Sequence, residues 1–182
     1  LVNGSQGIGT GWSTYIPQHS PLTVLDYIRS KLDHKVELPR IEPYSKGFNG
    51  SIERHDGHYA SYGNIKKLDK KTLLIDELPI NVWTHKYKEF LLKMQEKGSI
   101  DDIVEDHTTQ KVSFLVKVKP SQLQKLEEAG FAKSFRLTAK HSLMNMNAFD
   151  ASGDIRKFKT AEDIADSFFP TRLSLYHDRK SV

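Results

Sequence analysis

The glycine-rich start of the chain has the most unusual residue types and spacing. The run LVNGSQGIGTGW places glycine at Gly4, Gly7, Gly9 and Gly11, with Ile8 between two of them. Glycine lacks a Cβ atom, so such a segment can adopt torsions closed to other residues or let another molecule approach the backbone. Ile8 is a stiff β-branched side chain that would project alone from it. Because minor-groove proteins insert apolar side chains between base steps to kink DNA, the pattern fits an apolar wedge.

Two other interpretations of these glycines stay open. Backbone N–H groups of a glycine-rich loop can hold a phosphate at a helix start. However, the Gly-Lys-Ser/Thr ending of a P-loop and the wider glycine spacing of a dinucleotide-binding fold are both missing. The glycines could also serve tight turns between packed elements. Thr10 shares the ambiguity, because its hydroxyl could contact a sugar or phosphate or stabilise a turn.

A second candidate site surrounds Trp83. His85, Lys86 and Lys88 follow it closely, which places an aromatic face and cations near the start of an expected helix. This combination suits a phosphate backbone. The alternative is a core tryptophan beneath the helix.

Other polar groups are better explained without a site. His55 and His58 flank an expected turn and are close enough in sequence to share a metal, but a solvated turn explains them more simply. Glu105, Asp106 and His107 resemble an acid–base cluster, yet no nucleophile accompanies them and a loop is the better interpretation. We therefore predict no catalytic residue and no metal ligand in this chain.

Composition limits the class of protein. The 182 residues are 37% hydrophobic, enough for one domain, and the formal charge of +4 permits an anionic partner without requiring one. No segment is long and apolar enough to span a membrane, and the mean hydropathy is −0.54. The absence of cysteine excludes disulfides and thiolate chemistry. Since the chain opens on Leu1 with neither an initiator Met nor a signal peptide, we expect a piece of a longer protein.

The first half of the chain predicts a helix, a hairpin, a strand and a second helix. Ser20 and Pro21 can start a helix whose apolar residues recur at Leu22, Leu25, Ile28 and Leu32. Strand-like runs at 50–54 and 58–65 meet at the turn pair Asp56-Gly57, and 72–77 forms a further strand. Asn81 can then cap a helix that buries Tyr87, Phe90, Leu91 and Met94 and ends at Gly98.

The second half continues the mixture of helices and strands. The run KVSFLVKV alternates like a half-buried strand, a helix is expected over 121–129, and further strands over 134–138, 143–149 and 155–158. Thr160 and Asp163 resemble a capping box that opens a last helix, burying Ile164, Phe168 and Leu173, which Pro170 should kink or interrupt. Strict βαβ alternation is absent, so we predict an α+β fold with a mixed or antiparallel sheet and packed helices.

Several motifs occur together in one order along nearly the whole chain. They are NGSQGIGTGWST-IP, then G-x-I-E in Gly50–Glu53, then ELP-W-YKEFL from Glu77, and finally D-x-R-x-F-x-T-x-x-D-I with FF-x-x-RL-x-x-Y. In these motifs the chain resembles eukaryotic type IIA DNA topoisomerases (topoisomerase II). The resemblance implies that residues 1–20 end the winged-helix region, 21–160 form the tower domain and 161–182 start the coiled-coil arm.

The resemblance also implies an activity for the whole enzyme. A homodimer in the nucleus, which serves chromosome segregation, cuts one double-stranded DNA, passes another through and reseals the break with ATP and Mg²⁺. This segment would bind and bend the gate DNA beside the remaining domains. It lacks the nucleophilic tyrosine, which in the family follows an arginine, and it lacks an Asp-x-Asp pair for Mg²⁺ and an ATP-binding loop. We therefore expect it to be inactive by itself and to bind neither cofactor.

Site residues carry over from the motifs. Ile8 matches the family's intercalating isoleucine and Trp83 its tower contact to the bent DNA. The other DNA-contact candidates are Gly7, Gly9, Thr10, Lys86 and Lys88, then Lys46 and the basic residues Arg172, Arg179 and Lys180. The chain departs from the family at Pro170, where an acidic residue is usual.

Two alternatives to DNA binding make different predictions. A scaffold module that only holds neighbouring domains would bury Ile8 and Trp83. An autonomous nucleotide-dependent enzyme would need a phosphate-binding lysine at the glycines, and none is there.

Overall fold

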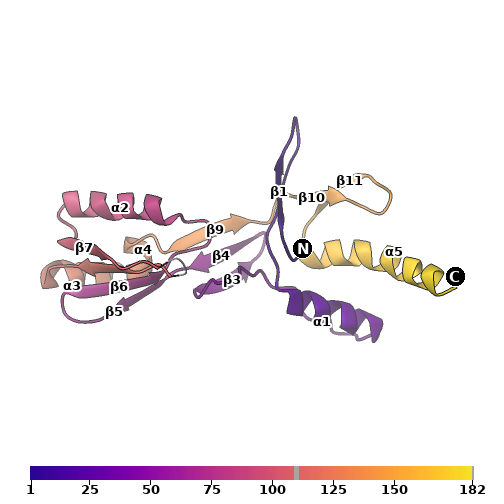
Figure 1. The fold of residues 1–182 in the computed structure, drawn as a ribbon, viewed down its shortest axis with the longest axis horizontal. Helices are drawn as coiled ribbons and strands as arrows, with labels where there is room; N and C mark the ends of the chain where they lie inside the picture. Colours follow the sequence, from indigo (N-terminus) through magenta and orange to yellow (C-terminus); the bar gives the residue numbers. More distant parts are fainter. Residues whose placement is uncertain (109–110, 182) are drawn as a thin grey trace. The chain divides into compact units, whose positions relative to one another are not determined.

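The chain folds into two compact units (Figure 1). This is a computed structural model, and it describes residues 1–108 and 111–181. The terminal unit contains Leu1–Ser45, Arg54–Tyr59 and the chain from Ser142 onward, and the central unit contains Lys46–Glu53 and Ala60–His141. The strands β3 (Ser51–His55), β4 (His58–Tyr62) and β9 (Thr138–Ser142) form one three-stranded sheet, and the boundary between the units falls within each of them. The predicted hairpin at Asp56-Gly57 joins β3 to β4 and is confirmed, with Gly57 at φ +69°.

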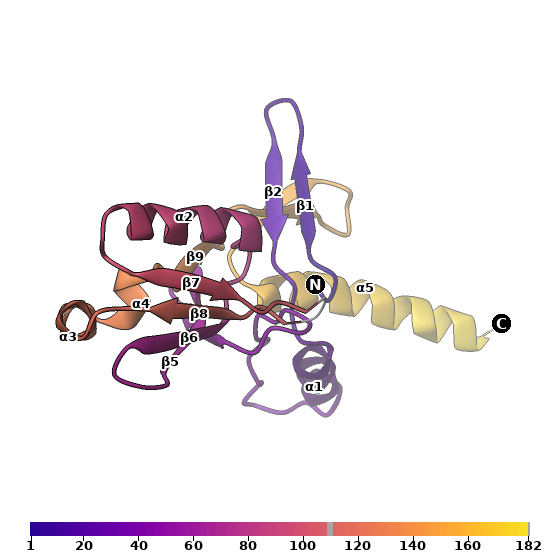
Figure 2. The same ribbon diagram turned by 60° about the vertical axis from the view of Figure 1, so that its left-hand side comes forward.

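The central unit is built on a four-stranded antiparallel sheet. Its strand order is β5 (Asn64–Lys67), β6 (Thr72–Glu77), β8 (Phe114–Lys117), β7 (Asp102–Glu105). The helix α2 (Thr84–Glu96) runs along this sheet (Figure 2), and α3 (Pro120–Glu128) and α4 (Phe131–Ser134) complete the unit. Alternate residues of β6 and β8 are buried, as their period of two predicts: Leu73, Ile75, Phe114 and Val116. Helix α2 adds Tyr87 and Leu91 to the same core.

The terminal unit contains two short hairpins and two helices. Strands β1 (Ser5–Ile8) and β2 (Ser13–Ile16) pair antiparallel, as do β10 (Met146–Phe149) and β11 (Ile155–Phe158). The helices are α1 (Pro21–Leu32) and α5 (Ala161–Ser181), and a small core of Tyr27, Ile41, Ala161 and Ala165 lies in this unit. The fold is therefore α+β with antiparallel strand pairs, as predicted. No helix within the described residues is long and apolar enough to cross a membrane.

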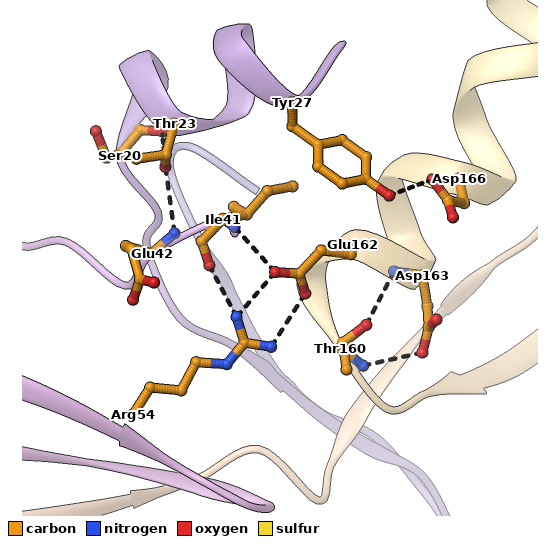
Figure 3. A network of polar contacts seen from close by, with 10 residues as sticks. All are labelled: Ser20, Thr23, Tyr27, Ile41, Glu42, Arg54, Thr160, Glu162, Asp163 and Asp166. Atoms are coloured by element: carbon orange, nitrogen blue, oxygen red, sulfur yellow. Dashed lines mark hydrogen bonds and ion pairs between the residues drawn. The ribbon is translucent and has the colours of Figure 1, made fainter. Parts of the chain in front are cut away.

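The start of α5 is fixed by side chains from the rest of its unit (Figure 3). The predicted capping box is confirmed, because the Thr160 N–H donates to the Asp163 carboxylate (3.1 Å) and the Asp163 N–H donates to Thr160 Oγ1 (3.0 Å). Next to it, the Glu162 carboxylate accepts hydrogen bonds from both terminal nitrogens of Arg54 and from the Ile41 N–H.

Pro170 lies inside α5, where we expected a kink or an interruption. The helix continues through Pro170 to Ser181, so it is not interrupted there. Proline removes one backbone hydrogen bond, here the one that would reach residue 166, but the ladder on either side continues. Residue 182, the last of the predicted coiled-coil segment 161–182, lies outside the described residues.

Three other local predictions were wrong. Trp83 is the N-cap of α2, whereas Asn81 takes a left-handed conformation (φ +65°) two residues earlier. The segment 134–138 is not a strand, because α4 ends at Ser134 and Arg136 has φ +51°; β9 begins only at Thr138. Strand β10 begins at Met146, three residues later than expected.

The buried faces of α1 and α5 also differ from prediction. Helix α1 buries Tyr27 and Ser30, while Leu22, Leu25 and Leu32 are exposed. Helix α5 buries Ala161 and Ala165, while Phe168 is exposed and Ile164 and Leu173 are half-buried.

Candidate nucleic-acid interface

Ile8 lies at the tip of the β1–β2 hairpin, which we call the wedge hairpin. Its side chain is 89% exposed. The tip closes through a hydrogen bond from the Gly9 N–H to the Trp12 carbonyl (2.8 Å), and Gly11 supplies the positive φ (+78°) that the turn needs. Thr10 lies exposed in the same turn. The hairpin itself was not predicted, because its strands are only four residues long.

The backbone on both sides of Ile8 has room for a Cβ atom. A Cβ atom at Gly7 would lie 3.7 Å from Thr14 Cγ2, and one at Gly9 would lie 3.7 Å from the Trp12 carbonyl oxygen, both ordinary contacts. Neither glycine has a positive φ. An alanine would therefore fit at both positions, and the missing side chains leave room for another molecule to approach the backbone.

Sequence reasoning missed an apolar cleft beside the wedge. The cleft has a volume of about 310 Å³, contains no charged residue in its lining and includes Gly7–Gly9, Trp12 and residues of the β10–β11 hairpin. Trp12 is 57% exposed, and Phe149 from β10 is 72% exposed. Single exposed apolar residues are normal, but here Ile8, Trp12 and Phe149 line one cleft, which makes it a candidate binding surface. The glycine pattern pointed to Ile8 and gave no signal for Phe149, which is remote in sequence.

Trp83 is 65% exposed at the start of α2, so the interpretation as a core tryptophan is wrong. Lys86 follows on the same helix and is also exposed. The two are therefore presented on one helix of the central unit, whereas the wedge hairpin belongs to the terminal unit. The scaffold alternative predicted that both Ile8 and Trp83 are buried, and both are exposed.

Lys88 is paired within the protein. Its ammonium lies 2.6 Å from the Glu105 carboxylate, whose second oxygen is 3.2 Å from His107 Nε2. The hydrogen bond from Lys88 lowers the pKa of Glu105, so the carboxylate stays charged at neutral pH. Glu105 and His107 belong to the suspected acid–base cluster. Glu105 is the last residue of β7 and pairs with Lys88. His107 also accepts a hydrogen bond from the Ser113 N–H, so both side chains have partners within the protein. A phosphate must compete with Glu105 for Lys88.

A groove along α2 holds better-placed cations, which we call the basic groove. It has a volume of about 370 Å³ and is lined by Lys86, Glu89, Phe90, Lys93, Met94, Lys97 and Arg136. None of its three lysines forms an ion pair with any residue that the structure describes. The Arg136 guanidinium lies 4.7 Å from the Phe90 ring centre, a cation–π distance that holds it in place.

The lysines of the basic groove could have been found from their spacing. Lys86, Lys93 and Lys97 are seven and four residues apart, which puts them on one helix face over about 16 Å at 1.5 Å per residue. Arg136 could not be found, because it reaches the groove from another part of the chain. The remaining candidates are exposed: Lys46, and on α5 Arg172, Arg179 and Lys180.

No metal centre accompanies these surfaces in the residues that the structure describes, where no group of three His, Asp or Glu side chains could hold an ion. The rings of His55 and His58 are stacked with centres 4.9 Å apart, at the hairpin turn that we expected. This arrangement agrees with a solvated turn.

Comparisons with known proteins give the chain its family. The model of the DNA gyrase/topoisomerase IV family, which describes the A-type subunits of these enzymes, matches residues 1–182. The chain is 39% identical to "DNA topoisomerase 2" of Pisum sativum over 99% of its length and 38% identical to that of Saccharomyces cerevisiae over 99%, and it spans 13% of each. It superposes with a TM-score of 0.92 and 38% identity on a solved Plasmodium falciparum "topoisomerase II DNA-binding, cleavage and re-ligation domain", covering 100% of this chain and 25% of that one. The resemblance to eukaryotic topoisomerase II is confirmed: the chain belongs to the DNA gyrase/topoisomerase IV family, within its A-type subunits.

Proposed function

We propose that this chain is the segment of a type II DNA topoisomerase that binds and bends the gate duplex, while the chemistry takes place on residues outside it. The observation that carries the proposal is Ile8, 89% exposed at a hairpin tip between two glycines that the fold does not require. Family membership and the named DNA-binding relative support it.

The wedge hairpin and the basic groove have different energetic roles. Bending a site of 20–30 base pairs costs on the order of 1–6 kcal/mol, and unstacking a base step costs a few kcal/mol more. An apolar wedge cannot supply this free energy alone, so cations elsewhere on the protein must hold the DNA. The four cations of the basic groove fit this role, with Trp83 beside them on α2. None of them carries the geometry of a base-edge reader, so we expect weak sequence preference.

In the whole enzyme we propose that ATP and Mg²⁺ act outside this chain, in a nuclear homodimer whose other domains supply the catalytic tyrosine. The tyrosines of this chain all lack the preceding arginine of the family's nucleophile. The chain alone should therefore bind DNA without cutting it.

The test measures binding and bending separately. The chain and its Ile8→Ala variant are titrated into an end-labelled duplex, with affinity followed by anisotropy and bend angle by energy transfer. Val36→Ala is the matched control, because Val36 is a 99% exposed β-branched residue of the same unit away from the hairpin. We expect Ile8→Ala to bind but bend less, and the control to behave as wild type.

Salt dependence tests the basic groove in the same assay. Four neutralised phosphates give a slope of about −3.6 in log K against log salt, so affinity should fall about 150-fold between 50 and 200 mM salt. A wild-type chain that binds duplex without bending it would refute the wedge. A chain that does not bind duplex at all would favour the scaffold alternative.

A further inference from the structure

Two asparagines hold the wedge hairpin from one side. The Asn147 side-chain amide donates to the Ser13 backbone carbonyl (2.8 Å), and the Asn147 backbone carbonyl accepts from the Thr14 hydroxyl (2.7 Å). One residue pair further along, the Asn145 carbonyl accepts from the Tyr15 N–H (2.8 Å), and its side-chain amide donates to Ser13 Oγ (2.8 Å). We call Asn145 and Asn147 the asparagine brace. All these residues lie in the terminal unit.

The two asparagines also support each other and sit on a fixed strand. Asn147 Nδ2 donates to Asn145 Oδ1 (2.9 Å), which orients both amides toward the hairpin. Asn145 immediately precedes β10 and Asn147 lies within it, on the opposite side of the chain from Met146, which is buried and pairs with the buried Phe158 of β11. The brace is therefore anchored to the interior, whereas Ile8 at the far end of the wedge hairpin is exposed.

The wedge hairpin needs a fixed orientation if Ile8 is to enter a duplex, and the asparagine brace can provide it. A two-stranded hairpin is only marginally stable in water. Unstacking the base step that Ile8 enters costs a few kcal/mol. A hairpin that could pivot freely would rotate away from the duplex, and the base pairs would stay stacked. The hydrogen bonds from β10 fix the direction of β2, and β2 pairs with β1 up to Ile8.

We propose that Asn145 and Asn147 are positioning residues for DNA bending: they lock the wedge hairpin in the orientation in which Ile8 enters the duplex. The inference rests on the proposed function, because it assumes that Ile8 bends DNA. It adds that bending depends on the segment at β10, whose Asn147 lies 133 residues from Thr14 in sequence, and β10 continues through β11 into α5.

The first test is Asn147→Ala in the bending assay. The variant loses both amide hydrogen bonds, so we expect about a 5- to 30-fold fall in the ratio of bent to unbent bound duplex, the range that one to two kcal/mol produces. Affinity should fall much less, because the basic groove is intact. Asn3→Ala, which changes an exposed asparagine of the same unit, is the matched control and should bend DNA as wild type does.

A second pair of variants separates positioning from folding. Thr14→Val removes the hydroxyl that donates to Asn147, whereas Thr14→Ser keeps it. We expect the valine variant to lose bending and the serine variant to retain it, with both proteins folded in thermal melts. If Asn147→Ala unfolds the unit, this pair decides the question.

The outcomes distinguish the two proposals. If Ile8→Ala loses bending while Asn147→Ala and Thr14→Val bend normally, the brace is refuted and the proposed function stands. If Ile8→Ala bends as well as wild type, or the wild-type chain does not bend DNA, the proposed function fails and the brace fails with it.

Discussion

Replacing Glu162 by glutamine should weaken the terminal unit in a way that depends on pH. The Glu162 carboxylate accepts the Ile41 N–H at 2.9 Å and the two Arg54 nitrogens at 2.8 and 3.0 Å, and both charged side chains are only 19% exposed. Glutamine keeps the shape but replaces one accepting oxygen by an NH₂ group, which faces the guanidinium as a second donor. Arg54 then keeps its charge in a half-buried place without a counter-charge.

The pKa of Glu162 gives the size and sign of the effect. Burial alone would raise this pKa, but the hydrogen bonds from Arg54 and the Ile41 N–H outweigh it and lower the pKa from 4.5 to about 2. The stabilisation is therefore complete above pH 4.5 and is lost as the pH falls from 4.5 toward 2. At 1.36 kcal/mol per pH unit the upper bound is about 3 kcal/mol. Water reaches a fifth of each side chain and screens the pair, so we expect about 1–2 kcal/mol.

Urea unfolding at two pH values checks the prediction. In a Trp83→Phe background the remaining tryptophan, Trp12, reports on the terminal unit. Wild type should exceed Glu162→Gln in free energy of unfolding by about 1–2 kcal/mol at pH 6.5, and the gap should nearly close at pH 2.5. Glu42→Gln, at an exposed neighbouring carboxylate, should change stability by less than about 0.5 kcal/mol. An equal gap at both pH values would refute the reasoning.

Three further predictions follow from single contacts. Thr160→Ala removes one half of the capping box and should lower the free energy of unfolding by about 1 kcal/mol in thermal melts. Gly7→Ala should leave thermal stability within about 0.5 kcal/mol of wild type and reduce DNA bending, whereas Gly63→Ala, whose Cβ would lie 2.4 Å from a backbone oxygen, should destabilise by about 2 kcal/mol or more. In salt titrations Lys93→Ala should flatten the slope by about 1, and Lys88→Ala by less, because Lys88 is already paired.

Local signals predicted most of the secondary structure. The alternation that starts at Val112 and the turn pair Asp56-Gly57 each act over a few residues, and the corresponding strands and hairpin are present. The capping box needs only Thr160 and Asp163, three residues apart. Such features succeed because their energies depend on neighbours in sequence.

Predictions failed where tertiary contacts decide. Leu22, Leu25 and Leu32 have the spacing of a core face, but α1 instead turns Tyr27 inward, where its hydroxyl donates to Asp166 at 2.6 Å. The leucine spacing in the sequence shows that α1 has an apolar face. It does not show whether other residues of the terminal unit pack against that face. Asn81 is a good N-cap residue in general, but its left-handed backbone places the cap at Trp83.

The candidate interface shows the same division between local and remote information. Ile8 could be found from its two glycine neighbours, and Lys86 from its position after Trp83. The basic groove is completed by Arg136, and the wedge hairpin is held by Asn147; both residues come from distant parts of the chain. No pattern in the sequence joins either of them to its site.

The four glycines at the start of the chain, which look alike in the sequence, serve different purposes. Gly11 needs its positive φ for the turn, and a Cβ atom at Gly4 would lie 2.9 Å from a backbone oxygen, so folding explains both. Gly7 and Gly9 have no positive φ and have room for a Cβ atom, yet they stand on either side of Ile8, which is 89% exposed. Glycine in a strand lowers stability relative to alanine, so Gly7 within β1 gives up stability that an alanine would retain. Under the proposed function, a DNA backbone that approaches closely beside Ile8 would account for both glycines, and we therefore expect Gly7→Ala to separate bending from stability.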